Sequence, residues 1–243
     1  MNYPWWDLEG CELLGLLLYE GGEGYAGAVN QRFNNLEQSI IALRPIVQML
    51  GVSSFPIPSA VRPIDRYVWL RAIIDLAFFR FSVIRDNCFF LVSEVFKLKL
   101  NPFQMSLGNL KKQKELYGTQ VLNILEEISL IGKSFRVERN KRAHQGIQRE
   151  IGNNEFDTLI FKVAAMTEEM GRGQVENYSL DGEYNKQVSL LHNVYVAEVE
   201  ALLNKVRELQ DCLVEPFSYR LKKASQKKQT QRALHKKSQI SKK

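Results

Sequence analysis

The stretch from Ile64 to Lys99 contains neither proline nor glycine over thirty-six consecutive residues, and it constrains the fold more than any other part of the sequence. Its apolar residues fall almost all the way round a helix of about 3.6 residues per turn. A helix that is apolar on nearly every side is stable in water only when other elements cover it. We therefore predict that Ile64–Lys99 is the central, buried helix of the fold, and that Asn101 and Pro102 end it.

The rest of the chain is also rich in helical patterns and poor in strand signals. Apolar residues recur at helical spacing from about residue 30 to residue 221. Further helices are predicted, the first with a kink at Pro45, over Asn30–Leu50, Leu107–Ile131, Phe135–Ile147, Phe156–Met170 and Tyr184 to about Leu221. The expected fold class is all-α, an antiparallel helical bundle with long helices. We expect residues 1–60 to form a helical or irregular extension, residues 61–221 the bundle, and residues 222–243 a disordered tail.

The net charge of +6 is unevenly distributed along the chain. Residues 217–243 hold ten of the 33 Lys and Arg residues and no Asp or Glu, which leaves 23 basic and 27 acidic residues in 1–216, a net charge of −4. A basic segment binds polyanions because it releases their counterions, so this tail is a candidate RNA-binding element; a solvated extension has the same composition. The candidate RNA-binding residues are Arg220, Lys222, Lys223, Lys227 and Lys228.

Other sequence features exclude several classes of protein. Cys11, Cys88 and Cys212 are scattered and odd in number, which argues against a disulfide framework and for a reducing compartment. Metal-binding spacings are not found in the sequence, so we predict no metal site and no cofactor. Asp75 and Arg80 interrupt the longest apolar stretch, which falls short of the about 20 residues that span a bilayer. With no signal peptide at the N-terminus, the expected location is the cytoplasm, with no membrane partner.

A polar stripe interrupts the apolar pattern of the predicted central helix. At about 100° per residue, its members fall within about 60° of one another: Arg71, Asp75, Ser82, Asp86 and Ser93. Charges placed among phenylalanines need partners, because an unpaired buried charge is very costly. The stripe forms internal ion pairs, beginning with Arg71 and Asp75 at i,i+4, or it lines a pocket or a dimer seam. We treat Arg71, Asp75 and Asp86 as residues that would support a functional site.

The most specific motif lies between Glu138 and His144. Arg139 is followed directly by Asn140, and His144 comes four residues after Asn140. This spacing resembles the R-N-x-x-x-H signature of the HEPN superfamily, and a chance match is expected about 0.03 times in a chain of this composition. The resemblance implies a HEPN-like, all-α bundle. It also implies one of two activities, because several HEPN lineages are metal-independent endoribonucleases of toxin–antitoxin, phage-defence and RNA-processing systems, whereas others bind nucleotides or assist minimal nucleotidyltransferases.

The three motif residues suit RNA cleavage without a metal. A neutral imidazole can take the proton of a ribose 2′-OH at cellular pH, so His144 is the candidate acid–base residue. The forked, permanently charged guanidinium of Arg139 can bind two phosphate oxygens and stabilise the transition state. Asn140 lies one turn before His144, where its amide can orient the ring or the phosphate. Arg139 is about 140° from His144 on an ideal helix, so the two converge only if Arg139 is near the helix start or its side chain wraps round.

Three functions are compatible with the sequence. The leading hypothesis is a metal-independent endoribonuclease whose partners are RNA and a second copy of the chain, since the resemblance implies two motifs paired across a homodimer. The alternative is a non-catalytic HEPN-type module that binds nucleotide, RNA or a partner such as a nucleotidyltransferase or an antitoxin. A third interpretation is a helical structural or interaction protein whose motif match is accidental, with the basic residues around His144 forming an ordinary solvated helix face.

Overall fold

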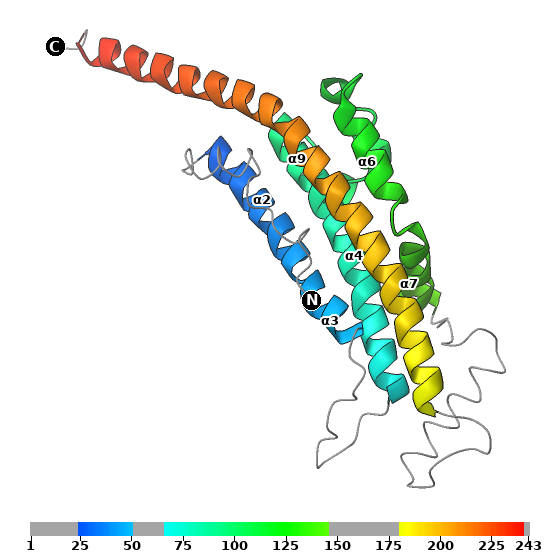
Figure 1. Cartoon of the computed structure of the whole chain (residues 1–243). Coiled ribbons are helices and arrows are strands. Elements are labelled where there is room, and N and C mark those ends of the chain that lie inside the picture. The colour runs from blue at the N-terminus through cyan, green and yellow to red at the C-terminus, as the bar shows by residue number, and fades with distance from the viewer. Residues whose placement is uncertain (1–23, 51–65, 146–179, 241–243) are drawn as a thin grey trace. The chain divides into compact units, whose positions relative to one another are not determined.

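The computed structural model describes residues 24–50, 66–145 and 180–240, and every regular element within these ranges is a helix (Figure 1). The elements in chain order are α2 (Tyr25–Ile41), α3 (Leu43–Leu50), α4 (Arg66–Phe96), the 3-10 helix η2 (Pro102–Gln104), α5 (Leu107–Leu110), the 3-10 helix η3 (Lys114–Leu116), α6 (Gln120–Leu130), α7 (Lys133–Gln145) and α9 (Leu180–Ile240). The predicted all-α fold class is confirmed. In these ranges no helix combines the length and the apolar character needed to cross a bilayer.

The chain divides into two compact units, each built from separate stretches of sequence. Among the described residues, unit 1 contains 24–38, 85–130 and 203–240, and unit 2 contains 39–50, 66–84, 131–145 and 180–202. Helices α4 and α9 contribute one end to each unit. The expected domain boundaries at residues 61 and 221 stay a prediction.

In unit 1, helix α2 runs antiparallel to the second half of α4. The Tyr25 hydroxyl donates a hydrogen bond to the carbonyl oxygen of Val95 (2.7 Å), and the Asn87 amide donates to the carbonyl oxygen of Asn35 (3.2 Å). Higher residue numbers on one helix thus pair with lower numbers on the other. Apolar residues of α2 at helical spacing are fully buried, which explains why the segment predicted as part of an N-terminal extension packs into the core; they are Val29, Phe33 and Leu36.

Helix α4 is less uniformly buried than its sequence predicts. Between Cys88 and Phe96 most of its side chains lie in the core, as expected for a central helix. In unit 2, by contrast, Leu76 and Phe79 are 38% and 50% exposed. The helix begins at Arg66, close to the predicted start. It ends at Phe96 because Lys97 adopts a left-handed conformation with φ of 53°, before the predicted stop at Asn101 and Pro102.

The predicted kink at Pro45 is confirmed as a break between two helices. Helix α2 ends at Ile41 and α3 begins at Leu43. Proline lacks an N–H group, and its ring collides with the carbonyl of the residue four positions earlier, which here is Ile41. The break lies where this clash would occur, and α3 still buries Leu43, Ile46, Val47 and Leu50.

The single helix predicted for Leu107–Ile131 is wrong. The segment instead forms α5, η3 and α6. Ser106 caps α5 by accepting a hydrogen bond from the Asn109 N–H at 3.3 Å. Gly118, with φ of 70°, then turns the chain into α6. The apolar spacing was correct for α6, where Val121, Ile124 and Ile128 are buried, but Gly118 and the polar residues before it interrupt the helix.

Helix α9 is longer than the sequence predicts. It runs without interruption from Leu180 to Ile240, with Pro216 inside it, whereas the prediction began at Tyr184, ended near Leu221 and continued as a disordered tail. In the structure, residues 222–240 are helical. The predicted helix over Phe156–Met170 and the glycine-rich stop after it lie outside the described residues.

Candidate functional site

All three motif residues lie on helix α7, from its midpoint at Arg139 toward its end rather than at its start. Arg139 is half-buried, and its Nε atom is buried without a hydrogen-bond partner in the described part of the chain. Asn140 is exposed. The backbone of His144 is helical, but its side chain lies outside the described set. The structure therefore places Asn140 and His144 one turn apart and Arg139 about 140° from His144 along the same helix.

The start of α7 is fixed by a tight turn at Gly132. This residue has φ of 62°, and a Cβ atom built on it would lie 2.5 Å from Cδ1 of Phe81. The Gly132 N–H donates a hydrogen bond to Oε2 of Glu198 on α9 (2.9 Å). The carboxylate also lies next to the first turn of α7, where the positive end of the helix dipole favours a negative charge.

An aromatic cluster holds the same end of α7 against α4 and α9 in unit 2. The ring of Phe135 stacks on Phe78, with centroids 5.1 Å apart, and meets Phe81 edge-on at 5.3 Å. Tyr195 of α9 completes the cluster, 5.8 Å from Phe81 and 6.1 Å from Phe135. Because Arg139 comes four residues after Phe135, it lies on the face of α7 that this cluster fixes.

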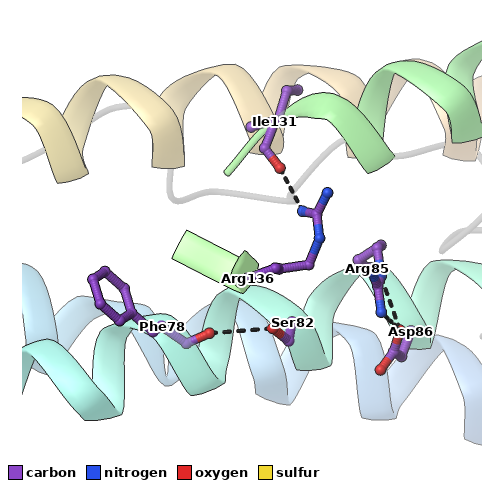
Figure 2. Close-up of polar contacts among 6 residues, drawn as sticks. All are labelled: Phe78, Ser82, Arg85, Asp86, Ile131 and Arg136. Atoms are coloured by element: carbon purple, nitrogen blue, oxygen red, sulfur yellow. Dashed lines mark hydrogen bonds and ion pairs between the residues drawn. The ribbon is translucent and has the colours of Figure 1, made fainter. Parts of the chain in front are cut away.

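Arg136 makes a buried hydrogen bond beside the aromatic cluster. It is 8% exposed, and its Nη1 donates a hydrogen bond to the carbonyl oxygen of Ile131 at 2.7 Å (Figure 2). The side chain therefore turns back toward the residue that precedes Gly132. A charged hydrogen bond of this kind contributes about 1.5–3 kcal/mol. Together, Gly132, Phe135 and Arg136 orient the helix that carries the motif.

Burial shifts the ionisation of two side chains near these helices. Desolvation raises the pKa of the Tyr195 phenol, an effect that the charge of Arg80 partly opposes. Desolvation also raises the pKa of the fully buried Cys88 thiol, and the negative charge of Asp86 acts in the same direction. Both groups are therefore neutral at cellular pH.

The polar stripe of α4 does not form one connected network among the residues whose side chains are described. Ser82 is buried and its Oγ donates to the carbonyl oxygen of Phe78 (3.3 Å), whereas Asp86 accepts two hydrogen bonds from the adjacent Arg85 at 2.9 and 2.6 Å (Figure 2). Asp75 is exposed. The predicted partner of Asp75, Arg71, has a side chain outside the described set, so the predicted pair between them stays a prediction.

The candidate RNA-binding residues of the tail are spread along the last part of α9. The Arg220 guanidinium lies over the ring of Phe96, 5.4 Å from its centroid, and Lys222 and Lys223 are exposed. Lys227 and Lys228 are on the same helix, and their side chains fall outside the described set.

No group of three or more His, Cys, Asp or Glu residues in the described ranges is arranged to hold a metal ion. Cys88 and Cys212 are free thiols, and Cys11 lies outside these ranges.

Sequence reasoning found the motif but missed the residues that position it. Arg136 and Glu198 show no recognisable pattern in the sequence, and the role of Gly132 depends on a contact that only the folded chain brings together. The Gly132–Glu198 hydrogen bond, for example, joins residues 66 positions apart. The available signal was the glycine itself, which stands between two helical patterns and indicates a turn.

Residues 25–207 match the model of the Cthe2314-like HEPN family, which is about three quarters of the chain. Comparison with curated proteins and with solved structures gives no match. The matched region begins at the start of α2, so it includes the helices that composition assigned to an extension. It also contains α7 and the whole R-N-x-x-x-H motif. The helical fold, the motif and the family match agree, and the chain belongs to the HEPN family.

Proposed function

We propose that this protein is a metal-independent endoribonuclease that cleaves RNA through Arg139, Asn140 and His144. Family membership supports the proposal, because HEPN domains are typically ribonucleases. The observation that carries it is the state of the motif arginine. Arg139 extends from a helix that is fixed at its start, and its buried Nε has no hydrogen-bond partner in the described part of the chain. Because the Nε atom is itself covered, a phosphate would bind the terminal Nη groups of this guanidinium, whose planar fork suits two phosphate oxygens.

The reaction would proceed by attack of the ribose 2′-oxygen on the adjacent phosphorus. His144 takes the 2′-OH proton, the new O–P bond forms, and the bond between phosphorus and the 5′-oxygen breaks. The leaving 5′-oxygen takes a proton from a general acid, and the products carry a 2′,3′-cyclic phosphate and a 5′-OH. Arg139 stabilises the charge that accumulates on the phosphorane oxygens. No redox step or bound metal is needed to balance this sequence.

The position of Arg139 within α7 favours a site made by two copies of the chain. Arg139 is not near the start of α7, so the simplest way for it to meet His144 within one chain is not available. A second motif facing the first would bring an arginine and a histidine together from opposite chains and would also supply the general acid. We therefore propose a homodimer as the active species.

The partial burial of Arg139 also supports a second candidate, a non-catalytic HEPN module that binds RNA, a nucleotide or a protein partner. In that case the arginine holds a ligand phosphate or a partner carboxylate without chemistry. A role in a toxin–antitoxin or phage-defence system, and an antitoxin or nucleotidyltransferase partner, are part of the proposal under either function. The basic end of α9 would add affinity for RNA that depends strongly on salt.

The test is cleavage of mixed cellular RNA by the full chain in excess EDTA. We expect 2′,3′-cyclic phosphate ends with the wild type, and a loss of rate of about 10²–10⁴ with His144→Ala, which removes the acid–base group. Arg139→Lys, which keeps the charge but not the fork, should also lose most activity. His192→Ala and Asn123→Ala are matched controls outside the motif and should cleave at the wild-type rate. Wild-type RNA binding without cleavage would support the second candidate, and equal cleavage by all variants would refute the assigned residues.

A further inference from the structure

Unit 1 contains a cavity of about 490 Å³ that the proposed reaction does not use. Its wall is built from the start of α2, the end of α4 and the segment that leads to η2. Cavities of about 300–1,000 Å³ hold small organic ligands. The motif residues of α7 are not among those that line it.

Two cations and one carboxylate line this cavity, which gives its wall a net positive charge. The guanidinium of Arg32 lies 5.0 Å from the ring centroid of Phe90, and its Nε is 4.0 Å from Oε2 of Glu94. The ammonium of Lys97 lies 4.1 Å from the ring centroid of Tyr25. The Arg32–Glu94 separation is long for a charged hydrogen bond, so the guanidinium keeps donor capacity for another anion.

The backbone holds Lys97 in a conformation that is unfavourable for a lysine. It occupies the first position after α4 with φ of 53°, and the Lys97 and Leu98 N–H groups bond to the carbonyl oxygens of Glu94 (3.1 Å) and Ser93 (2.9 Å). This is the Schellman arrangement, in which glycine is the usual residue because it has no Cβ. A glycine here would relieve the strain and remove the ammonium from the cavity wall. Backbone strain of this kind is concentrated at ligand-binding sites.

The ring under the Lys97 ammonium is itself held in place. The Tyr25 hydroxyl donates to the Val95 carbonyl oxygen at 2.7 Å, and its ring packs against Phe217 with centroids 5.6 Å apart. Burial raises the pKa of Tyr25, although the charge of Arg220 opposes the shift, so the phenol adds no negative charge to the cavity. The Lys97 ammonium thus lies over an uncharged ring that is held in place by its own contacts.

Several aliphatic side chains form another part of the wall. Leu98, Leu100, Pro102 and Met105 line the cavity beside the two cations. A site with cations at one part of the wall and aliphatic side chains at another is complementary to a molecule with an acidic head group and an apolar body. It is a poor match for a cation, which Arg32 and Lys97 would repel.

We propose that this cavity is a binding site for a small organic anion, with its acidic group on Arg32 and Lys97 and its apolar body against Leu98, Leu100 and Met105. The site is independent of the RNA-cleavage proposal, because it uses none of the motif residues.

The test compares two fluorescent probes that share their rings and differ in one charge. Anilinonaphthalene sulfonate carries an acidic group, and phenylnaphthylamine is the same ring system without it. The full-length protein should bind the sulfonate at least about tenfold more tightly than the neutral probe, because each charged contact is worth a factor of that order. Lys97→Gln and Arg32→Gln should each remove most of this difference, and Lys97→Arg should keep it. Lys112→Gln removes one charge at an exposed position outside the cavity and should bind like the wild type.

Lys97→Gly separates binding from folding. It relieves the left-handed strain, so it should be at least as stable as the wild type toward urea, and it should still lose the preference for the sulfonate. Equal wild-type affinities for the two probes would overturn the proposal. So would a stable Lys97→Gly protein that still prefers the sulfonate as the wild type does.

Discussion

The two turn glycines that precede helices α6 and α7 allow a direct measurement of how tightly α7 is held. Gly118 and Gly132 both have left-handed backbones, with φ of 70° and 62°. An alanine in this region costs about 1–2 kcal/mol at either position. The surroundings differ, because a Cβ on Gly118 meets nothing within 4 Å, whereas a Cβ on Gly132 lies 2.5 and 2.6 Å from two atoms of the Phe81 ring.

Phe81 cannot move away from such a Cβ without cost. It is 1% exposed and packs edge-on against both Phe135 and Tyr195. Overpacking of a core position costs about 1–3 kcal/mol. We therefore expect Gly118→Ala to lose about 1–2 kcal/mol and Gly132→Ala to lose about 2–5 kcal/mol, which is the backbone cost plus the clash.

Urea unfolding followed by circular dichroism measures both losses, with thermal unfolding as a second readout at about 2–4 °C per kcal/mol for a chain of this size. A Gly132→Ala/Phe81→Leu double variant should lose less stability than the sum of the two single losses, because the smaller side chain makes room for the Cβ. For Gly118→Ala combined with Phe81→Leu, the two single losses should simply add. Equal destabilisation by the two single alanine variants would show that Gly132 does not contact Phe81 as described, and would remove the reason to regard the start of α7 as rigid.

Three further outcomes follow from buried polar and titratable groups. Gln210 is 1% exposed, and its amide atoms have no hydrogen-bond partner in the described part of the chain. Gln210→Leu should therefore raise the free energy of unfolding in urea by about 1–3 kcal/mol, whereas Gln38→Leu at an exposed position should change it little. A lower stability of Gln210→Leu would contradict this. The raised pKa values of Cys88 and Tyr195 mean that the folded protein keeps protons that the unfolded chain releases above about pH 8.5 and 10. Stability should therefore be unaffected by these groups at neutral pH. It should fall by up to about 1.4 kcal/mol per pH unit above pH 8.5 because of Cys88, and by up to as much again above pH 10 because of Tyr195. Urea midpoints that stay level to pH 11 would disprove it. In a Cys11→Ser background, a thiol reagent should label half-buried Cys212 slowly and Cys88 only after unfolding, so rapid labelling of two thiols in the native protein is the contrary result.

The sequence was sufficient for features that depend on local rules. The long run without proline or glycine predicted α4, and Pro45 predicted the break between α2 and α3, because both effects act within one helical turn. Prediction failed over Leu107–Ile131, where a correct apolar spacing hid the turn at Gly118. It also stopped α9 near Leu221, since the basic composition of the tail masked a pattern that the structure shows as helix.

The candidate site was predictable only in part, because only some of its features depend on residues that are close together in the sequence. The spacing of Arg139, Asn140 and His144 is visible in the sequence and leads directly to the family. The buried Nε of Arg139 and the contacts that fix α7 depend on residues far away in the chain, such as Glu198 and Tyr195. Likewise, the cation of Lys97 becomes informative only when its left-handed backbone and the Tyr25 ring beneath it are known.

Each of the two units is made of stretches that are far apart in the sequence, and this affects how the chain can fold during synthesis on the ribosome. Unit 1 needs residues from 203 onward to cover helix α2, and unit 2 needs residues up to 202, so neither can be completed while the chain is still short. At about 5–20 residues per second, the apolar face of α2 waits roughly ten to thirty seconds for its last covering segment. Helix α7 likewise waits for Tyr195 and Glu198 to emerge. The fold that the proposed ribonuclease activity requires would therefore stay incomplete while the chain is attached to the ribosome, which is itself largely RNA, and would form only near or after release.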